Sequence, residues 1–577
     1  MNRQAKKNSG NWSALWLVLG FLVVMGWRGW VRASQYLHEP RAIREICNLR
    51  QFEQDLSPNS ANTRLVFCQD TEEGVGIYFC DTTGGKPRLL GEEKEKGRKG
   101  RRFTMLGWSP DDSRFACAFP ENKRDQELIL IFDGRTGEPV GKLVADPSLR
   151  LFGWLANDSF AYSVGGRSVR MAARQANGDW VHQRFFENVA TNMDNFTAIT
   201  ADSVAWRDKE GIGLLHLDSG LAERIWEAAT NRLMEFTYDR ATGEYLLNCD
   251  DAAGQYLLLF RPAERRQINL GPISQHHAYI RHVTWNKNHC SYVCLTNDLA
   301  GSAFCVKTGE LAKPTIIPWR GGIHSCALNG NHLFFSGNPD DQAPSLWDYD
   351  LQSGIFKCIA SSTGGPLERR FGSPSVSQAM TNSLGEQQFY HLWAPPHFSP
   401  DRKYPVLLAQ ELNDWFPCFP IAAQCGYFVA VVDRPFFKTW DGEPQQSWIE
   451  DVSRLQEIMA KNPNIDTSRV YLCACSRETF FLSQMLNERP ALAEGAILFS
   501  PVAFPDVSSV SNKCLFLVDG KADGDASKQL MAFQEHAAKK GDGITVFLQA
   551  NAGHNPAAGA TIRNRNWQFA QFISEHR

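Results

Sequence analysis

The sequence lacks several features that would assign a protein to a function class at once. Its 60 Lys and Arg residues nearly balance its 63 Asp and Glu residues, giving a net charge of −3. The charge balance therefore leaves no electrostatic footprint for nucleic acid. The chain has no glycine-rich phosphate loop, and none of its 15 cysteines forms a CxxC pair. A hydrophobic fraction of 43% and a charged fraction of 21% exclude a disordered or fibrous chain.

The most closely spaced cysteines are Cys290 with Cys294 and Cys473 with Cys475. Both pairs lie in apolar, strand-like stretches without a cluster of His or Cys nearby. Structural zinc sites use paired ligands on loops, so we interpret these thiols as small buried hydrophobic residues. We expect neither a metal nor an organic cofactor.

Long apolar runs are absent except near the N-terminus. Residues 8–27 carry no charge, and tryptophans crowd the ends of this segment. Twenty helical residues span about 30 Å, the thickness of the hydrocarbon core of a bilayer. The sequence therefore predicts a basic tail at 1–11, a transmembrane signal anchor at 12–27 and a linker at 28–60. We expect a single-pass protein of the cell membrane with the bulk of the chain outside the cytoplasm.

A cleaved signal peptide is the alternative to this anchor. Its cleavage site would be Val31-Arg32-Ala33, where the arginine makes the small-residue pattern poor. Basic residues lie on both sides of the apolar segment, so the membrane orientation stays open.

Residues 61–365 repeat one pattern at a period near 40 residues. In one unit, FTMLGWSPDDSRFACAF is followed by ELILIFDGRTGEPVGKL, which gives four short strands separated by polar turns. Four-stranded units at this period are typical of a β-propeller, and about seven units can be counted. A pair of β-sandwiches is the alternative, but it does not explain the repeated D-x-x-x-G turn.

After Gly372 the pattern changes to alternating strands and helices, which predicts an α/β domain at 372–577 with a mostly parallel sheet. We expect strands at Phe389–Ala394, Tyr404–Gln410, Gly426–Asp433, Arg469–Cys475, Gly495–Phe499, Cys514–Val518 and Thr545–Gln549, and helices at Ser447–Lys461, Arg477–Asn487 and Ser527–Lys540.

Three residues with the chemistry of a catalytic triad follow strands of this domain. Ser476 joins a strand directly to a helix, Asp523 follows the strand Cys514–Val518, and His554 follows Thr545–Gln549. The chain order Ser, Asp, His is that of the α/β-hydrolase fold. We predict that Ser476 is the nucleophile, that His554 is its base and that Asp523 orients the imidazole. Asp519 and Asp525 are the second choices for the acid.

The arrangement resembles the prolyl oligopeptidase family of serine peptidases, in which a propeller precedes an α/β-hydrolase domain. A single anchor ahead of both resembles its dipeptidyl peptidase IV branch. The local matches are PHFSPDRKYPVLL (396–408), GYFVAVVD (426–433), NPNIDTSRVYL (462–472), VDGKADGD (518–525) and AGHNP (552–556). The propeller matches by pattern only.

The elbow sequence departs from this family. The family pattern Gly-x-Ser-x-Gly-Gly is here Ala474-Cys475-Ser476-Arg477-Glu478-Thr479. Glu478 adds a negative charge near a developing oxyanion, where charge of that sign opposes catalysis. Residues 411–414 replace the turn that carries a second oxyanion donor in the dipeptidyl branch. The backbone N–H of Arg477 is therefore the one expected donor.

These features predict a membrane-anchored serine hydrolase that cleaves peptide or similar acyl bonds. The alternatives are a catalytically impaired pseudoenzyme that acts as a binding scaffold and an esterase for small esters. Expected partners are a peptide or small acyl substrate and the membrane, with no nucleic acid. The oligomeric state and the cleavage preference stay open.

Overall fold

The computed structural model describes residues 52–576 except for a set of short internal segments. These segments are 72–73, 85, 95–103, 121–126, 147–148, 229–231, 241, 252–253, 273–278, 287–288, 297–300, 309–314, 320, 340–344, 362–374, 384, 386, 397, 411–417, 433–444, 477, 511–512, 521–524, 539–543 and 550–558. The predicted tail at 1–11 and anchor at 12–27 lie outside the described residues. Within the described part, no helix has the length and apolar character needed to cross a bilayer.

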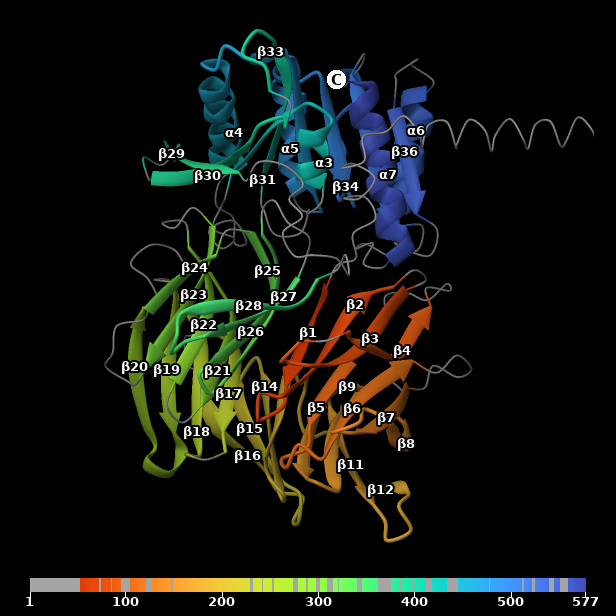
Figure 1. Cartoon of the computed structure of the whole chain (residues 1–577), viewed down its shortest axis with the longest axis vertical. Helices are drawn as coiled ribbons and strands as arrows, with labels where there is room; N and C mark the ends of the chain where they lie inside the picture. The colour runs from red at the N-terminus through yellow and green to blue at the C-terminus, as the bar shows by residue number, and fades with distance from the viewer. Residues whose placement is uncertain are drawn as a thin grey trace, which may run out of the picture.

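The described chain forms two parts stacked along the long axis of the molecule. A ring of β-sheets built from the first 28 strands occupies the lower part of Figure 1, and an α/β domain lies above one of its faces. Helix α7 (Gly559–Glu575) of the upper domain contacts strand β3 (Gly74–Asp81) of the ring. The active-site candidates belong to the upper domain.

The ring strands fall into seven four-stranded antiparallel sheets, each made of consecutive strands. The first four sheets contain β1 (Phe52–Pro58), β2 (Arg64–Asp70), β3 (Gly74–Asp81), β4 (Arg88–Lys94); β5 (Thr104–Trp108), β6 (Arg114–Pro120), β7 (Glu127–Asp133), β8 (Pro139–Ala145); β9 (Leu149–Ala156), β10 (Ser159–Val164), β11 (Ser168–Arg174), β12 (Trp180–Phe186); and β13 (Asn195–Thr200), β14 (Ser203–Asp208), β15 (Gly211–His216), β16 (Ala222–Glu227).

The last three sheets contain β17 (Arg232–Asp239), β18 (Glu244–Asp251), β19 (Gly254–Arg261), β20 (Arg266–Pro272); β21 (Tyr279–Asn286), β22 (His289–Thr296), β23 (Gly301–Thr308), β24 (Thr315–Trp319); and β25 (Gly321–Asn329), β26 (His332–Pro339), β27 (Ser345–Asp350), β28 (Ile355–Ser361). Each of the seven units counted in the sequence falls within one of these sheets. Neighbouring first strands contact one another around the ring, and β25 returns to β1. This radial arrangement is a β-propeller.

The propeller core consists of apolar layers between adjacent blades. Side chains alternate between the two faces of a strand, so one strand serves two layers. On β6, Phe115 and Cys117 pack toward the first blade, whereas Ala116 and Ala118 pack toward the third. This explains the continuous apolar run in the sequence of β6, because both faces of the strand are buried.

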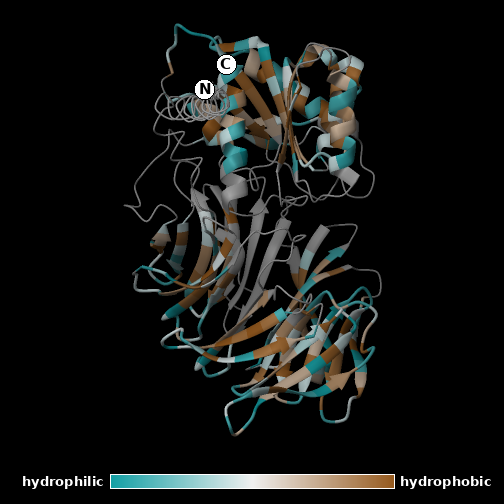
Figure 2. Ribbon diagram, turned by 90° about the vertical axis from the view of Figure 1, so that its right-hand side faces the viewer, coloured by the Kyte–Doolittle hydropathy of each residue, from teal (hydrophilic) through white to brown (hydrophobic). Residues whose placement is uncertain are grey.

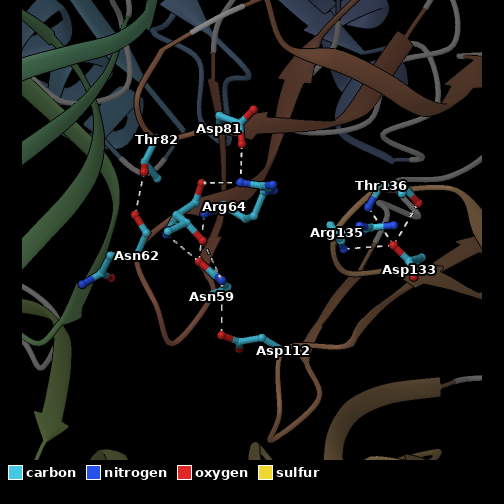
Figure 3. A network of polar contacts seen from close by, with 10 residues as sticks. Asn59, Asn62, Arg64, Asp81, Thr82, Asp112, Asp133, Arg135 and Thr136 are labelled. Atoms are coloured by element: carbon cyan, nitrogen blue, oxygen red, sulfur yellow. Dashed lines mark hydrogen bonds and ion pairs between the residues drawn. The ribbon is translucent and has the colours of Figure 1, made fainter.

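Aspartates close the turns between strands, as the D-x-x-x-G pattern predicts. The Asp133 carboxylate accepts hydrogen bonds from the backbone N–H groups of Arg135 (3.0 Å) and Thr136 (2.7 Å) and from the Thr136 hydroxyl (Figure 3). These hydrogen bonds, led by that from the Thr136 amide, hold the pKa of Asp133 below its ordinary value. Gly137 ends the turn with a φ of +66°, a conformation that favours glycine.

In the described part of the chain, the first and last blades each consist of consecutive strands of their own, and side chains join them where the ring closes. The Asn62 side-chain amide donates to the carbonyl of Asn329 (3.0 Å), and the Asn329 amide donates to the carbonyls of Asn59 (2.7 Å) and Ser60 (3.0 Å). Figure 3 shows the same turn bonded to Asp112 of the second blade. We call the contact between Asn59–Asn62 and Asn329 the ring seam.

The α/β domain contains one eight-stranded sheet in the order β29-β30-β32-β31-β33-β34-β35-β36. Only β29 and β30 run antiparallel to their neighbours. The strands are β29 (Val376–Thr381), β30 (Gln387–Trp393), β31 (Tyr404–Gln410), β32 (Phe428–Val432), β33 (Ile465–Cys475), β34 (Gly495–Phe499), β35 (Cys514–Gly520) and β36 (Ile544–Gln549). The described helices of this domain are α3 (Cys418–Gln424), α4 (Gln445–Ala460), α5 (Glu478–Glu488), α6 (Asp525–Ala538) and α7, with 3-10 turns at Pro490–Leu492 and Val507–Ser509. A further 3-10 turn, Pro262–Glu264, lies between β19 and β20 of the propeller.

Helices cover both faces of this sheet, as a mostly parallel sheet requires. Helices α3 and α7 pack on one apolar cluster, and α4, α5 and α6 pack on the other. Figure 2 shows mostly hydrophobic colour along the central strands of this domain, whereas hydrophobic and hydrophilic colours alternate along its helices. The rigid core places the carboxyl ends of β33 to β36 side by side.

In the described part of the chain, β1, β29, α3 and α7 differ from the structure expected from the sequence. Strand β1 lies inside the segment 28–60 that we assigned to a linker. Its charged sequence, FEQDLSP, lacks the alternation typical of a strand, so the sequence did not predict it. In the structure the strand forms by pairing with β2. Helices α3 and α7 were not predicted. The sequence of α3, CFPIAAQ, is apolar on all sides and has no helical periodicity to detect.

Candidate active site

The predicted catalytic residues all follow strands that end at one edge of the sheet. Strands β33, β34, β35 and β36 are parallel and adjacent (Figure 1), and ligands of such sheets bind at the carboxyl ends of the strands. Ser476 follows β33 directly. Asp523 and His554 follow β35 and β36 along the chain, and both lie outside the described residues, as does Arg477.

Ser476 occupies a sharp, strained turn between β33 and α5. Its φ is +45°, in the left-handed region that a residue with a Cβ rarely adopts. Its backbone N–H donates to the carbonyl of Phe499 (2.9 Å), and its own carbonyl accepts the N–H of Thr479 (3.1 Å). The side chain is half-buried. A half-buried serine on a strained strand–turn–helix junction is the geometry of a nucleophile elbow.

A second left-handed residue lies on the neighbouring strand end. Ser500 follows β34, has a φ of +43° and is buried. Its backbone N–H donates to the carbonyl of Val518 in β35 (2.7 Å). The turn at Ser476 is therefore attached to β34, and the turn at Ser500 is attached to β35 in the same way. Strained backbone of this kind persists where surrounding structure holds it, and it clusters at functional sites.

The alternative acids occupy different positions in the described structure. Asp519 is part of β35, pairs in register with Leu548 of β36 and is fully buried. Asp525 begins helix α6. Asp519 therefore lies in the sheet core, one residue past Val518, whose carbonyl holds the Ser500 turn.

The first turn of α5 combines one charge with one exposed aromatic ring. Glu478 is the first residue of α5, where the helix dipole favours a carboxylate. Phe480 is 46% exposed, although its neighbours Thr479 and Phe481 are buried. Val502, in the loop after β34, is 47% exposed. Both apolar side chains lie in segments joined to the elbow, since the Thr479 hydroxyl accepts the N–H of Val502 at 3.0 Å.

Among the described residues, no group of three or more His, Cys, Asp or Glu side chains is placed to hold a metal ion. Cys473 is buried in β33, and burial raises the pKa of its thiol well above the ordinary value. Cys473 is therefore a protonated, apolar core residue, as the sequence predicts, whereas its predicted counterpart Cys475 is only half-buried.

Comparisons with known proteins bear on the fold. No family model matches the sequence, and no curated protein matches it significantly. Solved structures do match. A structure from a study of two prolyl endopeptidases superposes with a TM-score of 0.70, at 12% identity over 92% of this chain and 90% of that one. The chain has the prolyl oligopeptidase fold.

Other solved structures extend this similarity. An acylaminoacyl peptidase bound to a chloromethyl ketone matches with a TM-score of 0.69, at 11% identity over 92% of this chain and 96% of that one. The dipeptidyl peptidase 4 of Porphyromonas gingivalis matches with a TM-score of 0.62, at 12% identity over 93% of this chain and all of that one. The similarity spans both domains, so the propeller and the α/β domain together form the shared fold.

Sequence reasoning did not identify two residues that shape the elbow, Thr479 and Ser500. Thr479 stands where the family pattern has its last glycine, and this departure was the available signal. The sequence carried no signal for Ser500, because a left-handed φ at a non-glycine residue follows from tertiary contacts.

Proposed function

We propose that this protein is a serine hydrolase that cleaves peptide or similar acyl bonds with Ser476 as its nucleophile. The observation that carries the proposal is the left-handed backbone of Ser476 at the carboxyl end of β33. Such a turn costs about 1–2 kcal/mol for a residue with a side chain. A serine that served only as a helix cap has no need of it. The shared peptidase fold supports the same assignment.

The reaction follows the acyl-enzyme route. Ser476 Oγ bonds to the acyl carbon while His554 takes its proton, then the C–N bond breaks and the amine leaves with that proton. Water, deprotonated by His554, cleaves the acyl ester and restores the hydroxyl of Ser476. Asp523 orients His554 throughout, and the N–H of Arg477 stabilises the oxyanion.

A fluorescent fluorophosphonate tests this proposal on the full-length protein. The probe bonds to an activated serine Oγ and loses fluoride, so labelling requires the nucleophile and its base. We expect the wild type to label and both Ser476→Ala and His554→Ala to lose labelling. Comparison of Asp523→Asn with Asp519→Asn identifies the acid, with circular dichroism to verify folding. A folded wild type that does not label contradicts the proposal and favours the pseudoenzyme.

Substrate profiling separates a peptidase from an esterase. A labelled peptide library and a series of small p-nitrophenyl esters are offered to the same preparation. A peptidase turns over both, since esters are the easier substrates. Turnover of the esters alone identifies the esterase.

Residues 12–27 form the membrane anchor in this proposal, with the bulk of the chain outside the cytoplasm. The support is the uncharged segment 8–27 with tryptophans at its ends. Alkaline carbonate extraction of membranes tests the anchor, and protease treatment of intact cells tests its orientation. Release of the full-length protein by carbonate contradicts the anchor, and a shortened mature N-terminus indicates a cleaved signal peptide.

A further inference from the structure

Thr479 joins the elbow to the next strand of the sheet through its hydroxyl. The residue is the second of α5 and is completely buried. Its hydroxyl donates to the carbonyl of Ser476 and accepts the backbone N–H groups of Val502 (3.0 Å) and Ala503 (3.4 Å). A threonine hydroxyl has one donor and two acceptor sites, so these three contacts use all of its capacity.

The Ser476 carbonyl receives two hydrogen bonds from this one residue. The backbone N–H of Thr479 reaches it at 3.1 Å, and the hydroxyl reaches it as well. The N–H of Ser476 is held from the other side by Phe499. The strained residue is therefore held at both of its backbone polar groups, which is what a left-handed serine needs in order to persist.

The loop that anchors Thr479 is itself held in place. Val502 and Ala503 follow Ser500, whose left-handed turn is bonded to Val518 of β35. The Thr479 hydroxyl consequently couples the ends of three adjacent strands, β33, β34 and β35. A glycine at this position has no hydroxyl, so it makes none of the three hydroxyl contacts.

The carbonyl of Ser476 matters because a peptide unit is planar. A carbonyl held in one direction fixes the plane of the peptide unit that Ser476 contributes to the elbow. We propose that Thr479 is a positioning residue for the nucleophile: its hydroxyl holds the Ser476 peptide unit in the reactive orientation. This inference rests on the proposed hydrolase function.

The test compares variants that differ in the hydroxyl alone. Thr479→Val keeps the shape and loses the hydroxyl, whereas Thr479→Ser keeps the hydroxyl. Ser483→Ala is the control on the same helix, because the Ser483 hydroxyl is buried and has no hydrogen-bond partner in the described structure. The second-order rate constant for fluorophosphonate labelling and the melting temperature are measured for each full-length protein.

We expect Thr479→Val to label at least tenfold more slowly than the wild type, with Thr479→Ser within threefold of it and Ser483→Ala unchanged. Rescue by serine separates positioning from packing, because serine restores the hydroxyl and not the methyl group. If Thr479→Val does not fold, Thr479→Ala replaces it in the same comparison.

Two results overturn the inference while leaving the hydrolase function intact. One is labelling of a folded Thr479→Val or Thr479→Ala protein within twofold of the wild-type rate. The other is a Thr479→Ser protein that is as slow as the valine variant at an unchanged melting temperature. Absence of labelling in the wild type instead contradicts the hydrolase function, and the inference falls with it.

Discussion

The backbone N–H of Ser476 donates to the carbonyl of Phe499 across a distance of 2.9 Å, although Phe499 belongs to the next strand of the sheet. This bond continues the pairing of β33 with β34 by one residue past the end of β33, at the point where the chain turns into α5. The strained turn is thus part of the sheet, which explains how a serine is held at a φ of +45°.

Substitution of Ser476 by glycine should stabilise the α/β domain relative to substitution by alanine. Both changes remove the nucleophile, but glycine adopts a positive φ without steric cost. We expect a free energy of unfolding about 1 kcal/mol higher for Ser476→Gly than for Ser476→Ala, measured by urea denaturation. Ser453, which lies inside α4, is the control. There the alanine variant should be about 1 kcal/mol more stable than the glycine variant. Equal stabilities at Ser476 would contradict the strain.

Removal of the charge on Glu478 should accelerate the reaction. The carboxylate is two residues from Ser476 and opposes a developing negative charge, so Glu478→Gln should raise the fluorophosphonate labelling rate about threefold to tenfold. Stability should fall by about 0.5 kcal/mol, because the carboxylate favours the helix N-terminus. Glu488→Gln, at the other end of α5, is the control and should label at the wild-type rate. An unchanged rate for Glu478→Gln would show that this charge does not reach the site.

The pair of Arg224 and Asp208 should make the fourth blade sensitive to acid. Arg224 contacts the Asp208 carboxylate with both guanidinium nitrogens, at 2.8 and 2.9 Å, and the aspartate is buried. Burial alone would raise the pKa of Asp208, but the hydrogen bonds from Arg224 and the Glu210 amide outweigh it and lower the pKa. The pair therefore stabilises the fold fully above the unfolded pKa of about 3.9 and less as the pH falls through the lower folded value.

Two variants of this pair test the effect. Arg224→Ala leaves a buried carboxylate unpaired and should cost about 2 kcal/mol at pH 7, below the value for fully buried pairs because the Arg224 side chain is 24% exposed. Asp208→Asn should lose less stability than the wild type between pH 5 and pH 2 in thermal melts. Asp158→Asn, whose side chain is 60% exposed, should follow the wild-type curve. Parallel curves for Asp208→Asn and the wild type would refute the assignment.

Weakening of the ring seam should loosen the first and last blades specifically. Asn329→Ala removes the two hydrogen bonds that its side chain donates to the carbonyls of Asn59 and Ser60 and should cost about 1–2 kcal/mol. We expect faster hydrogen exchange in β1 and β28 and unchanged exchange in β13 to β16, measured by mass spectrometry. Asn177→Ala, in a turn of the third blade, is the control. Uniform exchange across all blades would show that the seam does not limit opening.

Much of the architecture could be predicted because it rests on local patterns. Strand β31 occupies Tyr404–Gln410 as expected, and the predicted helix Ser447–Lys461 is α4 at Gln445–Ala460. The D-x-x-x-G turn at Asp133 forms through contacts within four residues. The alternation of a strand and the periodicity of a helix can both be recognised from residues that are close along the chain. The described residues place Ser476 at the predicted junction, whereas the predicted positions of Asp523 and His554 stay predictions.

The sequence by itself determined the two-part organisation, the blade repeat and a serine between a strand and a helix, since each depends on residues that are close along the chain. Only the tertiary structure decided the order of the sheet, in which β32 lies between β30 and β31, and the seam that joins Asn62 to Asn329 across 267 positions. It also decided the left-handed turn of Ser476 and the contacts of Thr479 with the β34 loop. These features depend on the backbone of distant segments, whose positions follow from packing of the whole domain rather than from any local preference.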